Sequence, residues 1–195
     1  MREIDKDLWL WDGLEDAEAR QKAVHGHLAG LLGCAPSSLH IVRDDLGRPL
    51  IEKPSTPLQF SQARRDGMVA LAADEDGRAV GVDVEIPQSG PWIETVAGDF
   101  FSAAEKRWLR GLDDSERADS FFRLWTAKEA VLKALGLGIA QGMAEPDFKS
   151  QLAKGHPFEA EAAQVEAFGK SFHLKWYFPQ VDNIPLVLCR AVQNP

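Results

Sequence analysis

Two acidic residues in the segment GVDVE (81–85) are spaced to act together on one face of a strand. If this segment is extended, its valines point to one face, and Gly81, Asp83 and Glu85 point to the other. The two carboxylates then lie about 7 Å apart along the strand, and they repel one another unless water or a cation lies between them. Carboxylate oxygens on a rigid strand suit Mg²⁺, which binds a few protein carboxylates together with waters and substrate phosphates.

A solvent-exposed strand face explains the same acidic pair equally well. With 30 acids among 195 residues, several pairs of acids two positions apart are expected from composition alone. Gly81 favours a site slightly, because a missing side chain allows a ligand or another backbone to approach closely. The acidic pair alone is therefore weak evidence for a metal site.

A second set of charged residues lies in the segment LWTAKEAVLKALGLG (124–138), which has the apolar spacing of a helix followed by a glycine stop. At about 100° per residue, Lys128 falls in the middle of the apolar face, while Glu129 and Lys133 lie together at its edge. An ordinary helical salt bridge is one explanation of the Glu129–Lys133 pair. Lys128 is harder to explain, because burying an uncompensated ammonium costs several kcal/mol or more. Its stem could extend past apolar neighbours to water, or a bound anion could be its partner.

One hypothesis joins both motifs. The carboxylates of Asp83, Glu85 and Glu129 hold Mg²⁺, the metal holds a pyrophosphate, and the lysines bind the remaining phosphates. It predicts that the three carboxylates meet within reach of one metal ion, on a strand and a helix from opposite halves of the chain.

The surrounding sequence predicts the elements that would position these residues. Residues 14–32 have helical apolar spacing that ends at Gly33, and residues 39–51 predict a short strand, a turn and a further extended piece. Residues 68–73 and 79–85 flank the turn-rich sequence DEDGR and predict a hairpin. In such a hairpin, the acidic strand pairs with the strand that precedes it.

The second half of the chain begins with two capping motifs. The sequence SAAE (102–105) is a capping box that begins a short helix through Leu109, and DDSE (113–116) offers caps for the long helix of the second motif. The last third predicts strands in three stretches: 158–168, 171–178 and 184–192.

The segment PQSGP (87–91) is the best candidate for a linker, and it divides the chain into parts of residues 1–88 and 89–195. Each part carries a long helix and about three predicted strands. This pattern predicts the α+β class, with two similar small halves in which a long helix packs on a small, mainly antiparallel sheet.

Composition argues against several classes of protein. The net charge of −8 argues against a nucleic-acid binder, although the 22 Lys and Arg residues are compatible with a local anion site. No apolar run approaches the roughly 18–20 residues of a membrane span. The N-terminal sequence carries acids and lacks a cleavage site, so we expect no signal peptide and a cytoplasmic protein. In that compartment, Cys34 and Cys189 are expected to be thiols rather than a disulfide.

The two motifs together resemble those of the 4'-phosphopantetheinyl transferases of the surfactin-synthetase-activator type. That family pairs a hydrophobic-Gly-hydrophobic-Asp-hydrophobic-Glu strand with Trp-Ser/Thr-x-Lys-Glu-x-x-x-Lys, after a gap of about forty residues. Here the two read VGVDVE and WTAKEAVLK, and the intervening DFFSAAEKRWL, the later GLG and the earlier GRP (47–49) are also similar to family sequence. The resemblance covers residues 39–140 well and the C-terminal strands loosely.

The resemblance implies a pseudo-twofold α+β fold with the active site between the halves. It implies a monomer that uses Mg²⁺, coenzyme A and an apo acyl or peptidyl carrier protein. Phosphopantetheine moves from the coenzyme to a carrier serine, and 3',5'-ADP is released.

The resemblance also implies roles for individual residues. Asp83, Glu85 and Glu129 correspond to the Mg²⁺ ligands, and Glu129 takes the serine proton directly or through a metal-bound water. Lys133 neutralises the pyrophosphate or assists the leaving group. Two further basic residues, Lys128 and Arg48, are expected to contact the nucleotide end of the coenzyme.

One stretch departs from the family pattern. Where the family has Asn-x-Ser-His-Ser, this chain has FSQARR, so Ala63 and Arg64 stand at the Ser-His positions. The family's histidine is expected to contact the coenzyme's 3'-phosphate, and Arg64 can hold the same phosphate with a planar, bidentate donor group. The alternative is that Arg64 is a solvated loop cation.

Three functions therefore compete: the transferase, a catalytically inactive binder of coenzyme A or carrier protein, and an unrelated Mg²⁺-dependent phosphohydrolase. The lost Ser-His pair favours the second, the acidic pair alone is all that supports the third, and the complete acidic triad favours the first.

Overall fold

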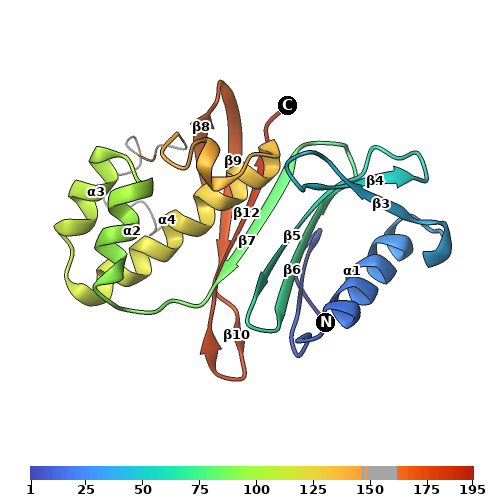
Figure 1. The fold of residues 1–195 in the computed structure, drawn as a ribbon, viewed down its shortest axis with the longest axis horizontal. Coiled ribbons are helices and arrows are strands. Elements are labelled where there is room, and N and C mark those ends of the chain that lie inside the picture. The colour runs from blue at the N-terminus through green and yellow to red at the C-terminus, as the bar shows by residue number, and fades with distance from the viewer. Residues whose placement is uncertain (146–147, 149–161) are drawn as a thin grey trace.

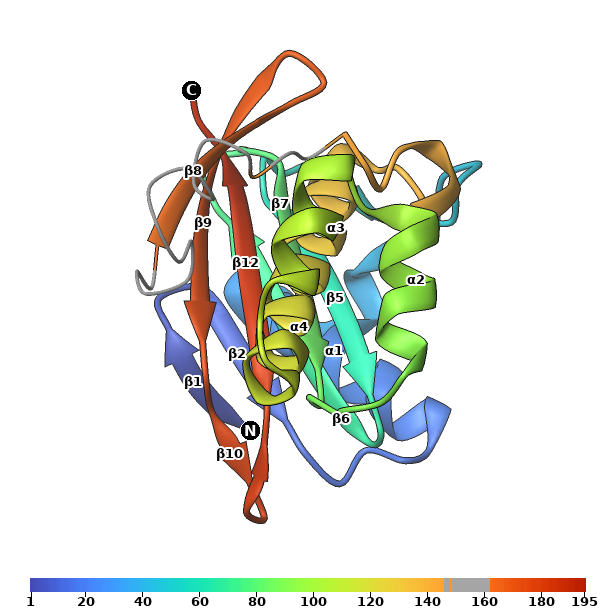
Figure 2. The ribbon, with the colours of Figure 1, turned by 90° about the vertical axis from the view of Figure 1, so that its left-hand side faces the viewer.

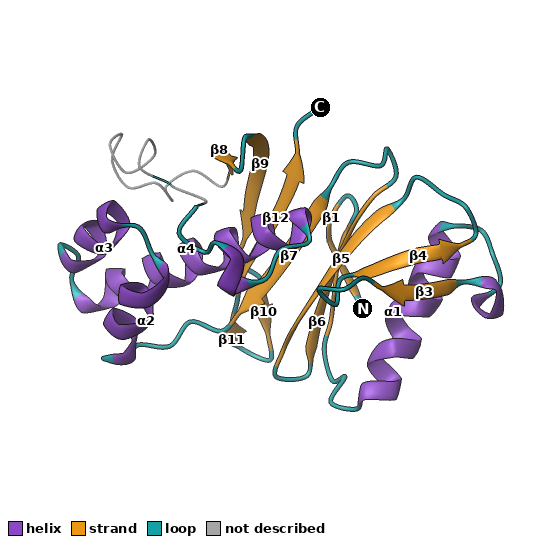
Figure 3. Cartoon of the chain, turned by 45° about the horizontal axis from the view of Figure 1, so that its top comes forward, coloured by secondary structure: helices purple, strands orange, loops and turns teal. Residues whose placement is uncertain are grey.

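The protein is described by a computed structural model that covers residues 1–145, 148 and 162–195. Within these residues, two antiparallel sheets of four strands pack together, and a long helix covers the outer face of each sheet (Figure 1). The strand order is β1-β2-β6-β5 in the first sheet and β7-β12-β9-β8 in the second. Figure 3 shows α2 and α3 at one end of the molecule and α1 toward the other, with α4 extending inward beside β7 and β12. The predicted α+β class is confirmed.

The strands are short and pair along most of their length. The first sheet contains β1 (Arg2–Asp5), β2 (Leu8–Trp11), β5 (Gln59–Arg65) and β6 (Met68–Asp74). The second sheet contains β7 (Val80–Glu85), β8 (Ala162–Ala167), β9 (Lys170–Tyr177) and β12 (Val187–Gln193). Two ribbons lie beside them, formed by β3 (His40–Arg43) with β4 (Pro49–Lys53) and by β10 (Gln180–Val181) with β11 (Ile184–Pro185).

The α-helices of the described residues are α1 (Ala17–Leu31), α2 (Trp92–Phe100), α3 (Ala103–Arg110) and α4 (Asp114–Leu135). Two of the helices, α3 and α4, begin at the predicted caps, whereas α2 was not predicted. The predicted capping box is present, because Glu105 N donates to Ser102 Oγ at 3.3 Å and Ser102 N donates to Glu105 Oε2 at 2.9 Å. The long helix α4 begins after Asp113, whose carboxylate accepts from Glu116 N, and ends at Gly136 with a φ of 72°.

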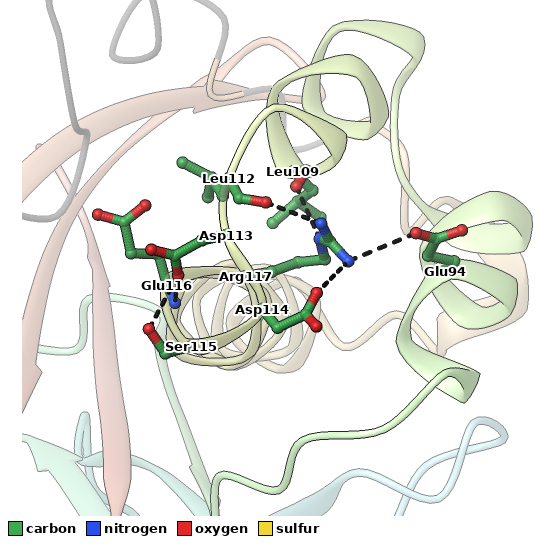
Figure 4. Close-up of polar contacts among 8 residues, drawn as sticks. All are labelled: Glu94, Leu109, Leu112, Asp113, Asp114, Ser115, Glu116 and Arg117. Carbon is green, nitrogen blue, oxygen red and sulfur yellow. Dashed lines mark hydrogen bonds and ion pairs between the residues drawn. The ribbon is translucent and has the colours of Figure 1, made fainter.

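Arg117 fixes the beginning of α4 to the two short helices (Figure 4). Its guanidinium donates to the carbonyl oxygens of Leu109 at 3.1 Å and Leu112 at 2.7 Å, at the end of α3. It also pairs with Asp114 at 2.9 Å and with Glu94 of α2 at 3.5 Å. These contacts hold the three helices together on one side of the second sheet, as Figure 2 shows.

The core lies in three layers around the two sheets. The predicted alternation of β7 is confirmed, because Val80, Val82 and Val84 are buried between the sheets in a cluster with Leu8 and Leu188. A second apolar cluster joins α1 to the outer face of the first sheet. A third joins α4 to the outer face of the second sheet.

The predicted hairpin of residues 68–73 and 79–85 is wrong. β6 pairs with β2 and β5, whereas β7 pairs antiparallel with β12 at the other end of the chain. The intervening turn carries the chain from one sheet to the other, and Arg78 holds it by pairing with the buried carboxylate of Asp74 at 2.7 Å. The predicted apolar alternation and turn are present, but neither specifies which strand is the partner of β7.

The remaining predictions mostly agree with the structure. The predicted strand and extended piece of residues 39–51 form the β3–β4 ribbon, and the predicted strands of the last third correspond to β8, β9 and β12. Part of the predicted strand 158–168 lies outside the described residues. In the described part of the chain, no helix is long and apolar enough to cross a membrane.

Candidate active site

The acidic strand β7 and the helix α4 are in direct backbone contact, and Gly81 is the reason. A Cβ atom at Gly81 would lie 1.8 Å from the carbonyl oxygen of Ala130 in α4, so only glycine allows this approach. The sequence left open whether a ligand or a backbone would use the gap, and it is the helix backbone. The approach brings Glu129 and Lys133 of α4 to the face of β7 that carries Asp83.

Two internal cations pair with the acids of β7. Lys133 Nζ lies 2.6 Å from Asp83 Oδ1, and Arg65 Nε lies 3.2 Å from Glu85 Oε2. Asp83 is 5% exposed, and its second carboxylate oxygen, Oδ2, is buried without a hydrogen-bond partner among the described residues. A buried carboxylate oxygen without a partner is costly, so this atom is a candidate ligand for a cation.

The electrostatics of the site indicate an excess of negative charge. Burial and the neighbouring Asp83 raise the pKa of Glu85 to about 7, and the same two causes raise the pKa of Glu129 to about 6. Burial alone would lower the pKa of the Lys133 ammonium, but Asp83 and the two glutamates outweigh it and raise that pKa. A divalent cation would relieve the repulsion among these acids.

The donor set fits Mg²⁺, since three carboxylates supply hard oxygen ligands and one of them has an unpartnered buried oxygen. Across the described residues, however, no three acidic, histidine or cysteine side chains already converge as a metal cage. Convergence of Asp83, Glu85 and Glu129 on one ion therefore stays a prediction. Asp83 and Glu85 lie in the part of residues 1–88 and Glu129 in the part of residues 89–195, as expected. In the fold, however, β7 is hydrogen-bonded into the sheet on which α4 packs.

Lys128 is not at this site, so its predicted contact with the nucleotide is corrected. Its side chain is 0% exposed, and Nζ lies 3.0 Å from Glu105 Oε1 and donates to Met143 O at 3.2 Å. The rings of Phe101 and Phe148 lie 5.4 and 5.8 Å from the ammonium. The anion that the buried Lys128 requires is the carboxylate of Glu105 in α3, a residue whose sequence pattern predicted only a helix cap.

A basic cavity adjoins the acidic cluster. Its volume is about 380 Å³, and Arg43, Arg48, Arg64 and Lys133 line it, with no acidic residue among the described lining residues. Arg48 donates to Gln59 Oε1 at 3.3 Å. Lys133 is the residue common to the two parts of the site, since it lines the cavity and pairs with an acid of the triad.

Two basic residues of the site had no predicted role. Arg43 pairs in register with Pro49 of GRP across the β3–β4 ribbon, so its closeness to Arg48 could have been inferred from the predicted turn. Arg65 ends β5 and reaches Glu85 at the end of β7. No sequence signal predicted that contact, because it depends on how the two sheets meet.

Comparison of the sequence with protein families shows which family contains this chain. The sequence profile of the 4'-phosphopantetheinyl transferase superfamily matches residues 79–189, more than half of the chain, and this range contains the whole acidic triad. The chain belongs to the 4'-phosphopantetheinyl transferase superfamily.

Individual transferases are similar over about half of their length. A putative 4'-phosphopantetheinyl transferase of Synechocystis is 32% identical over 130 residues, which cover 65% of this chain and 52% of that protein. The transferase HetI of Nostoc is 34% identical over 116 residues, covering 58% and 48%. The transferase Sfp of Bacillus subtilis is 29% identical over 104 residues, covering 53% and 44%.

The superfamily match divides the site of this phosphopantetheinyl transferase homologue in two. Asp83, Glu85, Glu129 and Lys133 lie inside the matched range, whereas the three arginines of the cavity lie before it. The family match therefore includes the acidic residues of the site. The three arginines of the cavity lie outside the match, and the evidence for them as a phosphate site is their position around one cavity.

Proposed function

We propose that this protein transfers the 4'-phosphopantetheine group of coenzyme A to a serine of an apo acyl or peptidyl carrier protein and releases 3',5'-ADP. The observation that carries the proposal is the position of Lys133, between an acidic triad suited to a divalent cation and a cavity lined by arginines. A substrate that carries a pyrophosphate and a further phosphate needs both kinds of site. Membership of the superfamily and the similarity to the transferases HetI and Sfp support the same reaction.

The proposed reaction is a displacement at the phosphorus that bears the pantetheine. The carrier serine oxygen forms a bond to that phosphorus, and the bond from phosphorus to the oxygen bridging to the adenosine phosphate breaks. The electrons of the broken bond leave with 3',5'-ADP. The serine proton passes to Glu129, a half-buried acid whose pKa is raised to about 6, so that it is ionised and a competent base near neutral pH.

The cation of the reaction would be Mg²⁺, held by Asp83, Glu85 and Glu129. When bound, it neutralises charge on the pyrophosphate. Lys133 contributes a permanent ammonium on the same side, and its pairing with Asp83 keeps that charge in place.

The basic cavity would hold the phosphates of the coenzyme. Arg48 and Arg43 come from the β3–β4 ribbon. Arg64, an exposed residue of β5, lines the same cavity. A guanidinium binds phosphate bidentately and remains charged at any working pH. We assign the 3'-phosphate to Arg64, in place of the histidine expected from the family pattern.

We further propose that the two sheets with their helices are related as pseudo-twofold halves of a monomer. The support is that α1 covers the outer face of the first sheet as α4 covers the outer face of the second (Figure 1). Along the chain, we propose a division into residues 1–88 and 89–195. The first part then supplies one strand, β7, to the second sheet.

One experiment separates the transferase from the two alternatives. The protein is incubated with coenzyme A, Mg²⁺ and an apo carrier protein, and both the carrier mass and the nucleotide products are measured. The transferase adds one phosphopantetheine to the carrier and yields an equal amount of 3',5'-ADP. Coenzyme A binding without either product would indicate the inactive binder, and nucleotide release without a heavier carrier would indicate a hydrolase.

A further inference from the structure

The last residues of two neighbouring strands from different sheets form an ion pair at the acidic site. β5 and β7 lie side by side where the two sheets meet, and Val82 N donates to Ser61 Oγ at 3.2 Å between them. Arg65 and Glu85 end these strands at the same side, with Nε of the guanidinium 3.2 Å from Oε2 of the carboxylate. The contact therefore depends on the packing of the two sheets and not on a local turn.

This ion pair differs from an ordinary surface pair. The Glu85 side chain is only 17% exposed, and it faces a pocket of about 220 Å³ whose walls include Trp92, Phe121 and Trp125 as well as Arg65. The Arg65 side chain is 37% exposed, so water reaches the pair on one side. Apolar rings on the other side reduce its solvation and strengthen the attraction relative to a fully solvated pair, which is worth little. Arg65 also lies 3.7 Å from Asp66, but that carboxylate is exposed and outside the triad.

The positive charge of Arg65 affects how strongly the site can bind a cation. Among the described residues, Lys133 pairs with Asp83 and Arg65 pairs with Glu85. With all of these groups and Glu129 ionised, one negative charge remains uncompensated. A divalent cation that uses Glu85 must share that carboxylate with a guanidinium, whose charge repels the incoming ion.

We propose that Arg65 is an internal counter-cation of the acidic site: it holds Glu85 in place when no metal is bound and competes with the metal for that carboxylate. Arg65 is thus a positioning residue that lowers the affinity of the triad for a divalent cation. Tight cation binding then requires the phosphates of a substrate in addition to the three carboxylates. The inference rests on the proposed metal site, and it goes beyond it by assigning a residue of this chain that opposes metal binding.

The test measures binding of Mn²⁺ alone, without substrate, from the spectroscopic signal of the free ion; Mn²⁺ prefers the same oxygen ligands as Mg²⁺. Replacing Arg65 by glutamine should tighten Mn²⁺ binding about five- to twenty-fold, because a nearby positive charge is lost. Arg65→Lys, which keeps the charge, should stay within about twofold of the unaltered protein. Arg110→Gln, an equal change of charge at an exposed residue at the end of α3, should also leave the affinity unchanged.

A second measurement separates this role from a purely structural one. In the presence of a metal chelator, the Arg65→Gln variant should melt at a lower temperature than the unaltered protein, because Glu85 loses its ion-pair partner. Saturating Mg²⁺ should raise the melting temperature of the variant by more than that of the unaltered protein, since tighter binding stabilises more. Equal or weaker Mn²⁺ binding by Arg65→Gln, or a melting temperature that Mg²⁺ does not raise further, would overturn the role of Arg65 and leave the metal site standing. Absence of Mn²⁺ binding by both proteins would overturn the metal site and this inference together.

Discussion

Lys128 and Glu105 form a completely buried ion pair, in which the ammonium lies 3.0 Å from the carboxylate oxygen Oε1 and both side chains are 0% exposed. The same carboxylate accepts from Ser102 N at 2.9 Å and from Phe148 N at 3.2 Å. The pair thus joins the start of α3 to the turn of α4 that precedes Glu129. It compensates the charge within the apolar face of α4 and fixes the helix that carries half of the candidate site.

Breaking this pair should destabilise the protein strongly. Lys128→Met keeps the apolar stem and removes the ammonium, which leaves Glu105 buried without its cation and should cost about 3–5 kcal/mol of unfolding free energy. Urea denaturation measures the loss. Lys175→Met, which breaks a half-exposed pair with Asp5, is the matched control and should cost less than about 1 kcal/mol.

The opposite result would indicate that Lys128 contacts coenzyme A. A Lys128→Met protein with nearly unchanged stability and a raised KM for coenzyme A would mean that the ammonium binds phosphate.

The Lys128–Glu105 pair also marks the limit of what the sequence predicted. Helical periodicity placed Lys128 correctly within the buried face of α4, but periodicity on one helix contains no information about which element packs on it. The capping box identified Glu105 as a residue at the start of a helix, and only the structure shows that its other carboxylate oxygen pairs with Lys128. The predicted phosphate partner was therefore wrong, although the requirement for an anion was right.

The same limit applies to the strands. Alternation identified the buried and the acidic faces of β7 from the sequence, because it depends on the geometry of one strand. Its partner β12 lies about a hundred residues away, and nothing local distinguishes it from the preceding strand β6. Arg65 was missed for this reason, since its contact with Glu85 exists only once the two sheets meet.

Lys133 should act mainly in the chemical step of the proposed reaction. Lys133→Ala should lower kcat by about 10²–10³ and raise the KM for coenzyme A much less, because negative charge develops on the departing phosphate during the reaction. Steady-state kinetics at saturating carrier protein measures both constants. Lys170→Ala, at an exposed residue that begins β9, should change neither. An effect confined to KM would show that Lys133 only binds the substrate.

Arg64 should recognise the 3'-phosphate. Arg64→Ala should weaken coenzyme A binding by about 1.5–3 kcal/mol, the range for a hydrogen bond to a charged group, and should barely affect dephospho-coenzyme A, which lacks that phosphate. Calorimetric titration of the two ligands against both proteins measures the difference. Equal losses for the two ligands, or no loss for either, would make Arg64 a solvated cation of β5.

His27 should make stability depend on pH below neutrality. Its ring lies 4.3 Å from that of Trp9 and 5.3 Å from that of Trp11 between ring centroids, and burial lowers its pKa below the ordinary value of 6.5. The unfolded chain therefore takes up the proton first, so the contribution of His27 is complete above pH 6.5 and declines as the pH falls below that value.

The comparison that isolates His27 is between the unaltered protein and His27→Phe. Urea denaturation at pH 7.5 and pH 5.5 should show that acid lowers the stability of the unaltered protein relative to this variant. Glu85 and Glu129 have raised pKa values and therefore make stability rise as the pH falls. Their contribution is the same in both proteins, so it cancels when the two are compared. His173→Gln, at an exposed residue, should behave as the unaltered protein does. An identical pH dependence in His27→Phe would contradict the assignment.

The central claim is that the acidic triad beside Lys133 transfers phosphopantetheine to a carrier serine. The most direct measurement is the mass of an apo carrier protein after incubation with coenzyme A, Mg²⁺ and either the unaltered protein or Asp83→Asn, with circular dichroism to verify that the variant is folded. We predict that the carrier gains one phosphopantetheine with the unaltered protein, only when Mg²⁺ is present, and gains nothing with the folded variant. A carrier that stays unmodified with the unaltered protein, or one that Asp83→Asn modifies at a near-normal rate, would contradict the account.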